Sequence, residues 1–115
     1  MFDFENLIVY QKSLKYTDFV LDFLKNHNEI DIFLSDQLKR AVISITINIA
    51  EGAGRVTHRD KRNFYIIANG STFESIAILQ IIKNKYKIDQ EFYSNCYSKA
   101  EEIVKMLQGL IKNLK

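Results

Sequence analysis

Apolar and polar positions alternate with a period of three to four residues over most of the chain, and this pattern predicts four long α-helices. We expect the helices over residues 4–25, 35–53, 59–84 and 90–113. Proline is absent and glycine occurs only four times, so few residues can interrupt them. In the last helix the apolar positions form a near-heptad seam: Phe92, Cys96, Ala100, Ile103, Leu107, Leu110 and Leu114.

Capping residues set the predicted boundaries of these helices. Side-chain oxygens before a helix accept hydrogen bonds from free N–H groups of its first turn. The predicted N-caps are Asp3, Ser35, Thr57 and Asp89. After the second helix, Gly52 and Gly54 offer the left-handed backbone that often ends a helix.

The short connections between the helices predict antiparallel neighbours. We therefore expect an all-α fold, an antiparallel up-down-up-down four-helix bundle, as a single domain over residues 1–115. The first helix would face the core with a stripe of residues three and four apart: Leu7, Tyr10, Leu14, Thr17, Leu21 and Leu24. The second segment is rich in β-branched residues, but a strand is disfavoured because Ser44, Thr46 and Asn48 would share one face.

A line of polar residues runs along the predicted second helix at steps of three and four. Its members fall within a narrow arc of the helix: Gln37, Arg40, Ser44, Asn48, Glu51 and Arg55. Apolar residues flank this line on both sides, with Ala41 and Ile45 on one flank and Ile43 and Ile47 on the other. Ser35, Lys39 and Thr46 mark the opposite side, which is expected to face water. If both flanks are buried, the line needs polar partners.

Partners for the polar line are available on the third helix. Ser71 and Glu74 lie three residues apart and share one face, and Gly70 beside them lets another backbone approach closely. Polar contacts of this kind can fix the register of helices, join subunits, or form an active site. The first role is favoured, and the sequence leaves the second open.

The densest basic stretch is GRVTHRDKRNFY, between the second and third helices. Only Asp60 offsets its cations, which are Arg55, Arg59, Lys61 and Arg62. Basic side chains neutralise phosphates, and the aromatic residues that follow could stack on bases. The stretch is therefore a candidate nucleic-acid-binding patch; the alternative is a solvated helix start. Arg55 could belong either to this patch or to the polar line.

Patterns that carry catalysis are missing. The chain has two histidines and no Glu-x-x-His pair, so we expect no metal site and no cofactor. Cys96 lies on an apolar seam and is predicted to be a core residue rather than a nucleophile. The segment GAGRVTHR lacks the Gly-Lys-Ser/Thr ending of a phosphate-binding loop. We do not expect an enzyme.

Composition and charge fit a soluble domain of the cytoplasm. Of 115 residues, 47% are hydrophobic and 26% are charged, which is typical of a globular protein. The single cysteine rules out an internal disulfide. The acidic N-terminus does not resemble a signal peptide, and the tract AVISITINIA is too short to span a membrane.

The segments QLKRAVISITINIAEGAGR and FYIIANGSTFE, with the opening FENLIVYQKS, resemble a bacterial family of four-helix-bundle proteins. The family includes proteins encoded in intervening sequences of 23S ribosomal RNA genes, and accessory proteins of diversity-generating retroelements look like its relatives. The likeness covers nearly the whole chain. Its most specific part runs from Ser44 to Gly52, where Thr46 and Ile47 replace the proline or small residue frequent in the family.

The resemblance implies a protomer that assembles into a ring-like homo-oligomer, a homopentamer in known members. It also implies a nucleic-acid-associated role, with RNA or a reverse-transcriptase-like protein as a partner. From these inferences we expect a non-enzymatic scaffold that binds structured RNA or a ribonucleoprotein through basic loops. The alternative is a self-assembling protein-interaction module without a nucleic-acid partner.

Overall fold

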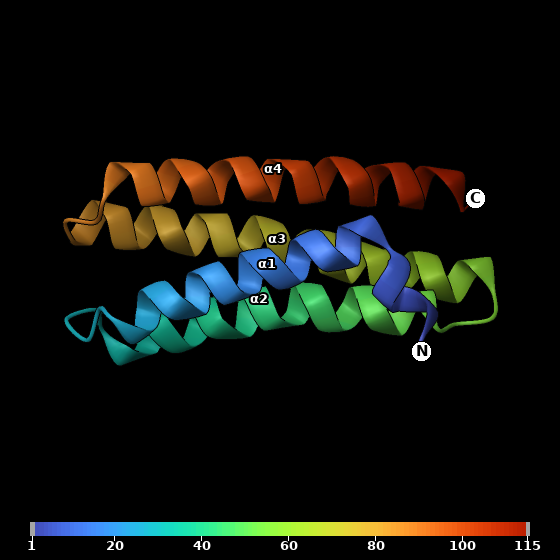
Figure 1. Ribbon diagram of the computed structural model, residues 1–115, viewed down its shortest axis with the longest axis horizontal. Helices are drawn as coiled ribbons and strands as arrows, with labels where there is room; N and C mark the ends of the chain where they lie inside the picture. The colour runs from blue at the N-terminus through green and yellow to red at the C-terminus, as the bar shows by residue number, and fades with distance from the viewer. Residues whose placement is uncertain (1, 115) are drawn as a thin grey trace.

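The structure is a computed structural model that describes residues 2–114. A 3-10 turn, η1 (Asp3–Asn6), precedes four helices: α1 (Ile8–Lys25), α2 (Ile32–Ala53), α3 (His58–Lys85) and α4 (Gln90–Asn113). The expectation of four long helices is confirmed, and within the described residues there is no strand. Figure 1 shows the α1–α2 and α3–α4 turns at one end of the molecule, and the α2–α3 turn at the other end with both termini.

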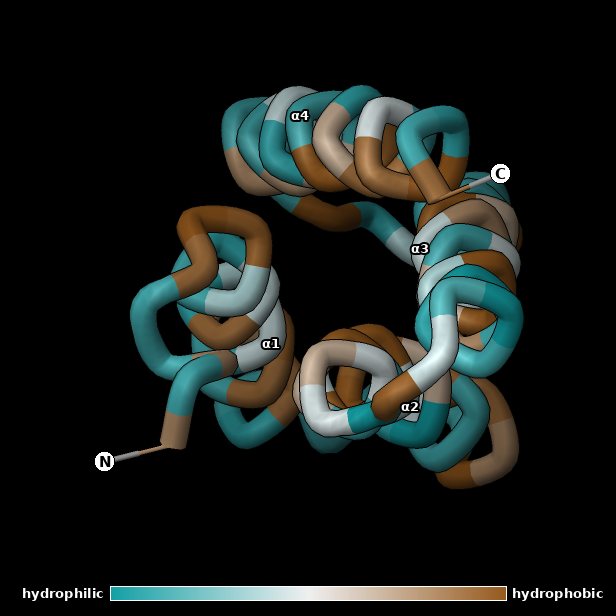
Figure 2. The backbone as a smooth tube through the Cα atoms, turned by 90° about the vertical axis from the view of Figure 1, so that its right-hand side faces the viewer, coloured by the Kyte–Doolittle hydropathy of each residue, from teal (hydrophilic) through white to brown (hydrophobic). Residues whose placement is uncertain are grey.

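The four helices surround one core in a molecule of 44 × 26 × 22 Å. Each helix packs against the next one along the chain, and α4 also packs against α1. Viewed end-on, α2 and α4 lie across from each other with α3 between them (Figure 2). Within residues 2–114, no Cα of α2 lies within 8 Å of a Cα of α4.

The predicted caps hold for the last two helices and fail for the first two. Thr57 accepts from the backbone N–H of Asp60, and Asp89 accepts from that of Glu91. The second helix begins three residues before the predicted cap, because the Asp31 carboxylate accepts from Phe33 N–H and extends the helix to Ile32. Asp3 begins only the 3-10 turn, since Leu7 is extended and separates it from α1.

The buried face of α1 overlaps the predicted stripe, of which Thr17 and Leu24 are buried, but other residues fill most of it. Val9, Tyr16, Val20 and Phe23 fill the core, whereas Leu14 is 41% exposed. This face contains a tyrosine and small polar residues, so a hydropathy pattern does not identify it as buried. Such residues can be buried because their hydroxyls find hydrogen-bond partners. The seam of α4 is confirmed from Phe92 to Leu107, while Leu110 and Leu114 are partly buried.

Gly52 serves the packing of helices rather than a left-handed helix end. Within residues 2–114 no residue has positive φ, and the C-cap Gly54 is right-handed. A Cβ on Gly52 would lie 2.8 Å from Tyr65 Cε1 and 3.1 Å from Phe64 Cβ. The missing side chain therefore lets the end of α2 pack closely against the start of α3.

Among residues 2–114, α3 is the one helix that combines the length and the mean hydropathy of a membrane span. By length and composition alone, α3 could cross a membrane. In the structure it packs against both α2 and α4, and 44% of its most apolar window is buried. It is thus a core helix of a globular bundle.

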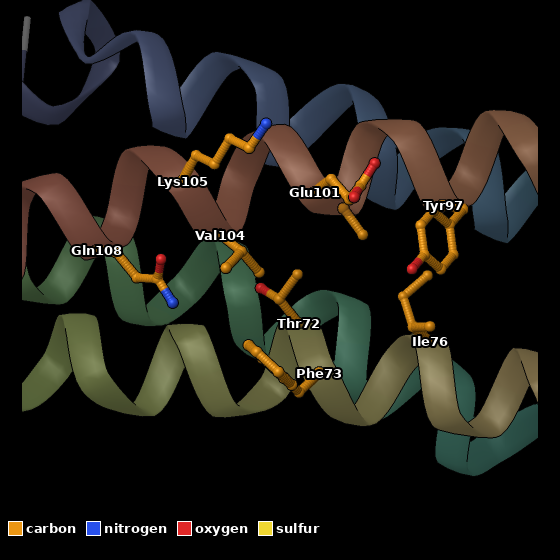
Figure 3. Close-up of a pocket in the computed structure, with 9 residues that line it drawn as sticks. Thr72, Phe73, Ile76, Tyr97, Glu101, Val104, Lys105 and Gln108 are labelled. Atoms are coloured by element: carbon orange, nitrogen blue, oxygen red, sulfur yellow. The ribbon is translucent and has the colours of Figure 1, made fainter.

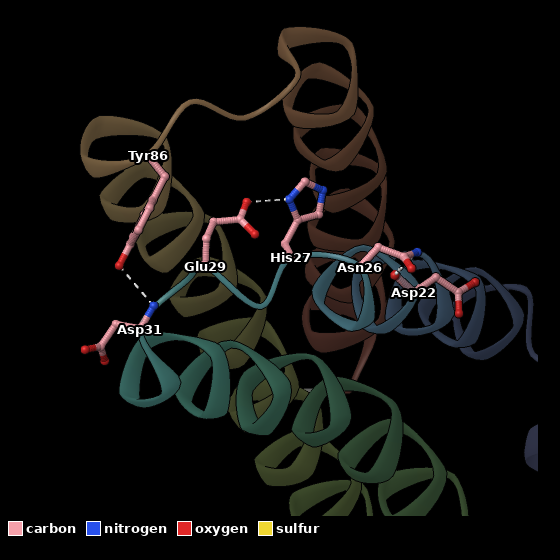
Figure 4. A network of polar contacts seen from close by, with 6 residues as sticks. All are labelled: Asp22, Asn26, His27, Glu29, Asp31 and Tyr86. Atoms are coloured by element: carbon pink, nitrogen blue, oxygen red, sulfur yellow. Dashed lines mark hydrogen bonds and ion pairs between the residues drawn. The ribbon is translucent and has the colours of Figure 1, made fainter.

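Polar contacts close the end of the bundle where α1 turns into α2 (Figure 4). His27 Nδ1 lies 2.8 Å from Glu29 Oε2, and the Asp31 N–H donates to the Tyr86 hydroxyl after α3 at 3.0 Å. The His27 contact lowers the pKa of the Glu29 carboxyl, which is exposed. The His27 ring also stacks on Phe23 at 4.1 Å between ring centroids. These contacts fix the α1–α2 turn.

Candidate interaction surfaces

The polar line of α2 meets α3 through a small hydrogen-bonded cluster. Ser44 Oγ and Ser71 Oγ lie 2.8 Å apart and join the two helices. Asn48 Nδ2 donates to the Ser44 carbonyl at 2.8 Å and to Ser44 Oγ at 3.0 Å. The structure thus brings together three of the predicted residues.

Outside this cluster, the polar line is not bonded to the partners predicted on α3 within residues 2–114. Glu51 pairs with Arg55 at 3.0 Å across one helical turn. Within residues 2–114, the side chains of Gln37, Arg40 and Glu74 have no hydrogen bond or ion pair. No atom of the described chain lies within 4 Å of a Cβ built on Gly70, so no backbone approaches there.

Only one flank of the polar line is buried. Ala41 and Ile45 lie in the core, but Ile43 and Ile47 on the other flank are 40% and 52% exposed. The assumption of two buried flanks is therefore wrong for the single chain. The line instead runs along the edge between the core and an exposed apolar surface.

A second polar seam, unnoticed in the sequence, joins α2 to α1. Thr17 Oγ1 donates to the Val42 carbonyl at 2.9 Å and lies 3.1 Å from Thr46 Oγ1. Thr46 Oγ1 donates to Ser13 Oγ at 3.2 Å. The expectation that Ser35 and Thr46 face water is wrong, because both are buried against the bundle. The sequence feature that could have indicated this seam is Thr17, a polar residue within the apolar stripe of the first helix.

Two of the four predicted basic residues serve the fold. Arg55 pairs with Glu51, and its guanidinium carbon lies 4.5 Å from the ring centroid of Phe64. Lys61 Nζ donates to the Ala53 carbonyl at 2.8 Å, where α2 ends. A cation at a helix C-terminus stabilises the helix dipole. These contacts connect the two sides of the α2–α3 turn.

The other two basic residues line a hollow at the start of α3. Arg59 and Arg62 surround it together with His58, Asn63 and Leu114 from the chain end. The hollow measures about 290 Å³. Within the described residues, Arg59 and Arg62 form no ion pair with a carboxylate. Their charges therefore face solvent.

The buried ionisable groups are suited to packing rather than to chemistry. Burial raises the pKa of the Cys96 thiol to about 12, so it is protonated at neutral pH. Burial also raises the pKa of Tyr16, whose hydroxyl lies 2.9 Å from Ser75 Oγ across the core. No group of three potential metal ligands occurs among residues 2–114.

Comparisons with known proteins agree with this architecture. A family model described as 23S rRNA-intervening sequence protein matches residues 5–109. The chain is similar to a crystal structure from Bacteroides thetaiotaomicron VPI-5482, a protein of unknown function from the S23 ribosomal protein family. The two share 27% sequence identity and a TM-score of 0.85, over 91% of this chain and 99% of the other. No curated protein matches the chain.

Proposed function

The chain belongs to the family of 23S rRNA-intervening sequence proteins, and from this premise we propose that it is a homo-oligomeric scaffold that binds structured RNA. In this proposal the protomer is an antiparallel up-down-up-down bundle, which the alternating ends of the connections support. The oligomer is a ring, with five subunits by resemblance to the family. The protein works in the cytoplasm without a cofactor and is not an enzyme.

The observation that carries the proposal is a row of exposed apolar side chains on the outer sides of α2 and α3. Its members are 40–58% exposed: Ile43, Ile47, Ile66, Ile67, Phe73 and Ile81. Large apolar side chains left exposed on neighbouring helices are typical of an interaction site. The polar line beside this row remains half open to solvent, so a neighbouring subunit would complete its burial.

The RNA part of the proposal is supported by Arg59 and Arg62. Their guanidinium groups are not held by carboxylates of the described chain, and they line a concave site. Arginine contacts phosphate in a fork geometry that suits nucleic acids. A ring would repeat this pair around its axis, so the combined positive field would exceed that of one protomer. A reverse-transcriptase-like protein that carries such an RNA is a proposed further partner.

An enzymatic role is less well supported by the two candidate carboxylates, one on α2 and one on α3. Glu51 and Glu74 are both exposed, and Glu51 is paired with Arg55. Acid–base catalysis usually depends on carboxylates whose pKa is shifted in a closed cleft.

Light scattering coupled to size-exclusion chromatography tests the assembly. We expect a particle mass that is a multiple of the 13.5 kDa protomer over a range of protein concentrations. A monomer at every concentration would overturn the scaffold proposal.

Fluorescence anisotropy with a labelled RNA hairpin tests the RNA part. The double variant Arg59→Ala/Arg62→Ala should lose about tenfold or more in affinity, and the magnitude of the slope of log K against log salt should fall by about 1.4–1.8. The matched control, Lys85→Ala/Lys87→Ala, removes two exposed charges from the opposite end and should retain affinity. Equal binding by the two double variants would favour a self-assembling module without an RNA partner.

A further inference from the structure

A groove runs between α3 and α4 on the surface of the bundle (Figure 3). Its volume is about 340 Å³, and its lining includes Phe73, Ile76, Tyr97 and Val104. Phe73 and Tyr97 are 58% and 43% exposed, so the groove is open and apolar. Figure 3 shows the rings of Tyr97 and Phe73 approaching the groove from opposite helices.

Two charges of opposite sign lie along the α4 side of this groove. Glu101 and Lys105 are exposed and lie one helical turn apart, following Tyr97 at the same spacing. Within residues 2–114, neither side chain forms an ion pair. The groove therefore presents an aromatic residue, an acid and a base in one row.

The outer side of α2 presents a complementary row. Asp36, Arg40, Ile43 and Ile47 lie at steps of four, three and four residues, and all four are exposed. Such spacing places them on one ridge of the helix. Neither Asp36 nor Arg40 forms an ion pair within the described chain. We call these four residues the α2 ridge.

We propose that the α3–α4 groove of one protomer receives the α2 ridge of a second copy of this chain. The inference rests on the proposed homo-oligomer and adds the two surfaces that mate in it. Arg40 of one copy pairs with Glu101 of the next, Asp36 pairs with Lys105, and Ile43 packs on Tyr97. The exposed apolar side chains of both surfaces are buried by the same contact.

The charges select the direction of the incoming helix. With the ridge antiparallel to α4, both pairs join opposite charges. With the ridge parallel to α4, Asp36 faces Glu101 and Arg40 faces Lys105, so both pairs join like charges. Like charges across an interface disfavour the wrong arrangement.

The position of the two surfaces makes the contact heterologous. The ridge lies on α2 and the groove lies beside α4, and these helices are across from each other in the bundle (Figure 2). Each copy can thus use its ridge on one neighbour and its groove on another. Head-to-tail contacts of this kind build rings when the rotation between copies closes.

A charge-swap experiment tests the mating surfaces. Arg40 and Glu101 form no ion pair within the described chain, and no Cα of α2 lies within 8 Å of a Cα of α4, so direct coupling between the two charges acts between copies. We expect Arg40→Glu alone and Glu101→Arg alone to raise the concentration at half-assembly by about tenfold or more. Combining both changes in one chain should restore assembly, because every contact then joins opposite charges again.

Controls and outcomes separate this inference from the broader proposal. Lys15→Glu and Asp18→Arg reverse exposed charges on α1 and should leave assembly unchanged. Circular dichroism checks that each variant is folded; if a variant unfolds, the pair Asp36→Lys and Lys105→Asp replaces it. Single variants that assemble normally, or a combination that stays dissociated, overturn the mating surfaces but leave the oligomer intact. A monomeric wild type overturns both.

Discussion

Helix α2 carries two polar seams that differ in how completely they are buried. Toward α1, the hydroxyls of Thr46, Thr17 and Ser13 are buried and bond one another. Toward α3, Ser44 and Asn48 are only half-buried, although they bond each other and Ser71. The first seam is complete within one chain, whereas the second borders an apolar surface that the chain leaves uncovered.

The difference shows that the residue types of a seam do not reveal its burial. The sequence drew attention to the α3 seam because it contains an amide and charged residues. The α1 seam consists of hydroxyl-bearing residues, which a hydropathy pattern treats as neutral, yet it is the one that the core encloses. Small hydroxyls fit a tight helix interface because they can donate to nearby backbone carbonyls.

The largest expected effect comes from introducing a charge into each seam. Thr46→Asp places a carboxylate among buried hydroxyls and should destabilise the fold by about 3 kcal/mol or more. Ser44→Asp has room to hydrate its carboxylate and should cost the protomer less than about 1 kcal/mol. Urea unfolding followed by circular dichroism measures both. Equal losses would contradict the distinction between the two seams.

A smaller effect is expected at Gly52, where α2 packs closely against α3. The Cβ of Gly52→Ala would meet the buried Tyr65 ring, so we expect a loss of about 1–2 kcal/mol despite the better helix propensity of alanine. Gly109→Ala is the matched control, because nothing lies within 4 Å of its Cβ and α4 is exposed there. This control should gain about 0.5–1 kcal/mol. Thermal unfolding resolves both signs, and a stabilising Gly52→Ala would refute the close contact.

The smallest effect should come from single hydrogen bonds. Thr17→Val keeps the shape of the side chain but removes the donor to the Val42 carbonyl, for an expected loss of about 1 kcal/mol. Asn48→Ala removes only bonds within its own helix turn, so its cost to the isolated protomer should be about 0.5 kcal/mol. Chemical unfolding of the two variants at low protein concentration ranks them. A larger loss for Asn48→Ala would mean that the α3 seam, not the α1 seam, holds α2 in place.

Much of the fold could be predicted from the sequence, and the errors have identifiable causes. The seam from Phe92 to Leu107 was readable because its positions are apolar and regularly spaced. The start of α2 was missed because Asp31 stands inside a segment that otherwise looks irregular. This error concerns a few residues whose role depends on what packs against them.

The candidate sites were harder to predict than the fold. The sequence grouped Lys61 with Arg59 and Arg62 in one patch and left Arg55 between this patch and the polar line. It could not reveal that Arg55 lies over Phe64 or that Lys61 donates to Ala53, because both contacts depend on the path of the α2–α3 turn. The groove was not foreseen either, since it is formed by side chains from two different helices.

The single thiol of the chain lies at the centre of the bundle, where Cys96 is completely buried and protonated. Thiol reagents require a thiolate that they can reach, so labelling of Cys96 has to wait until the helices separate. The rate of labelling therefore measures how often the bundle opens. In the proposed homo-oligomer every protomer carries the same buried thiol. Comparing the labelling rate of free and assembled protein would therefore measure how far neighbouring subunits slow the motion of the helices.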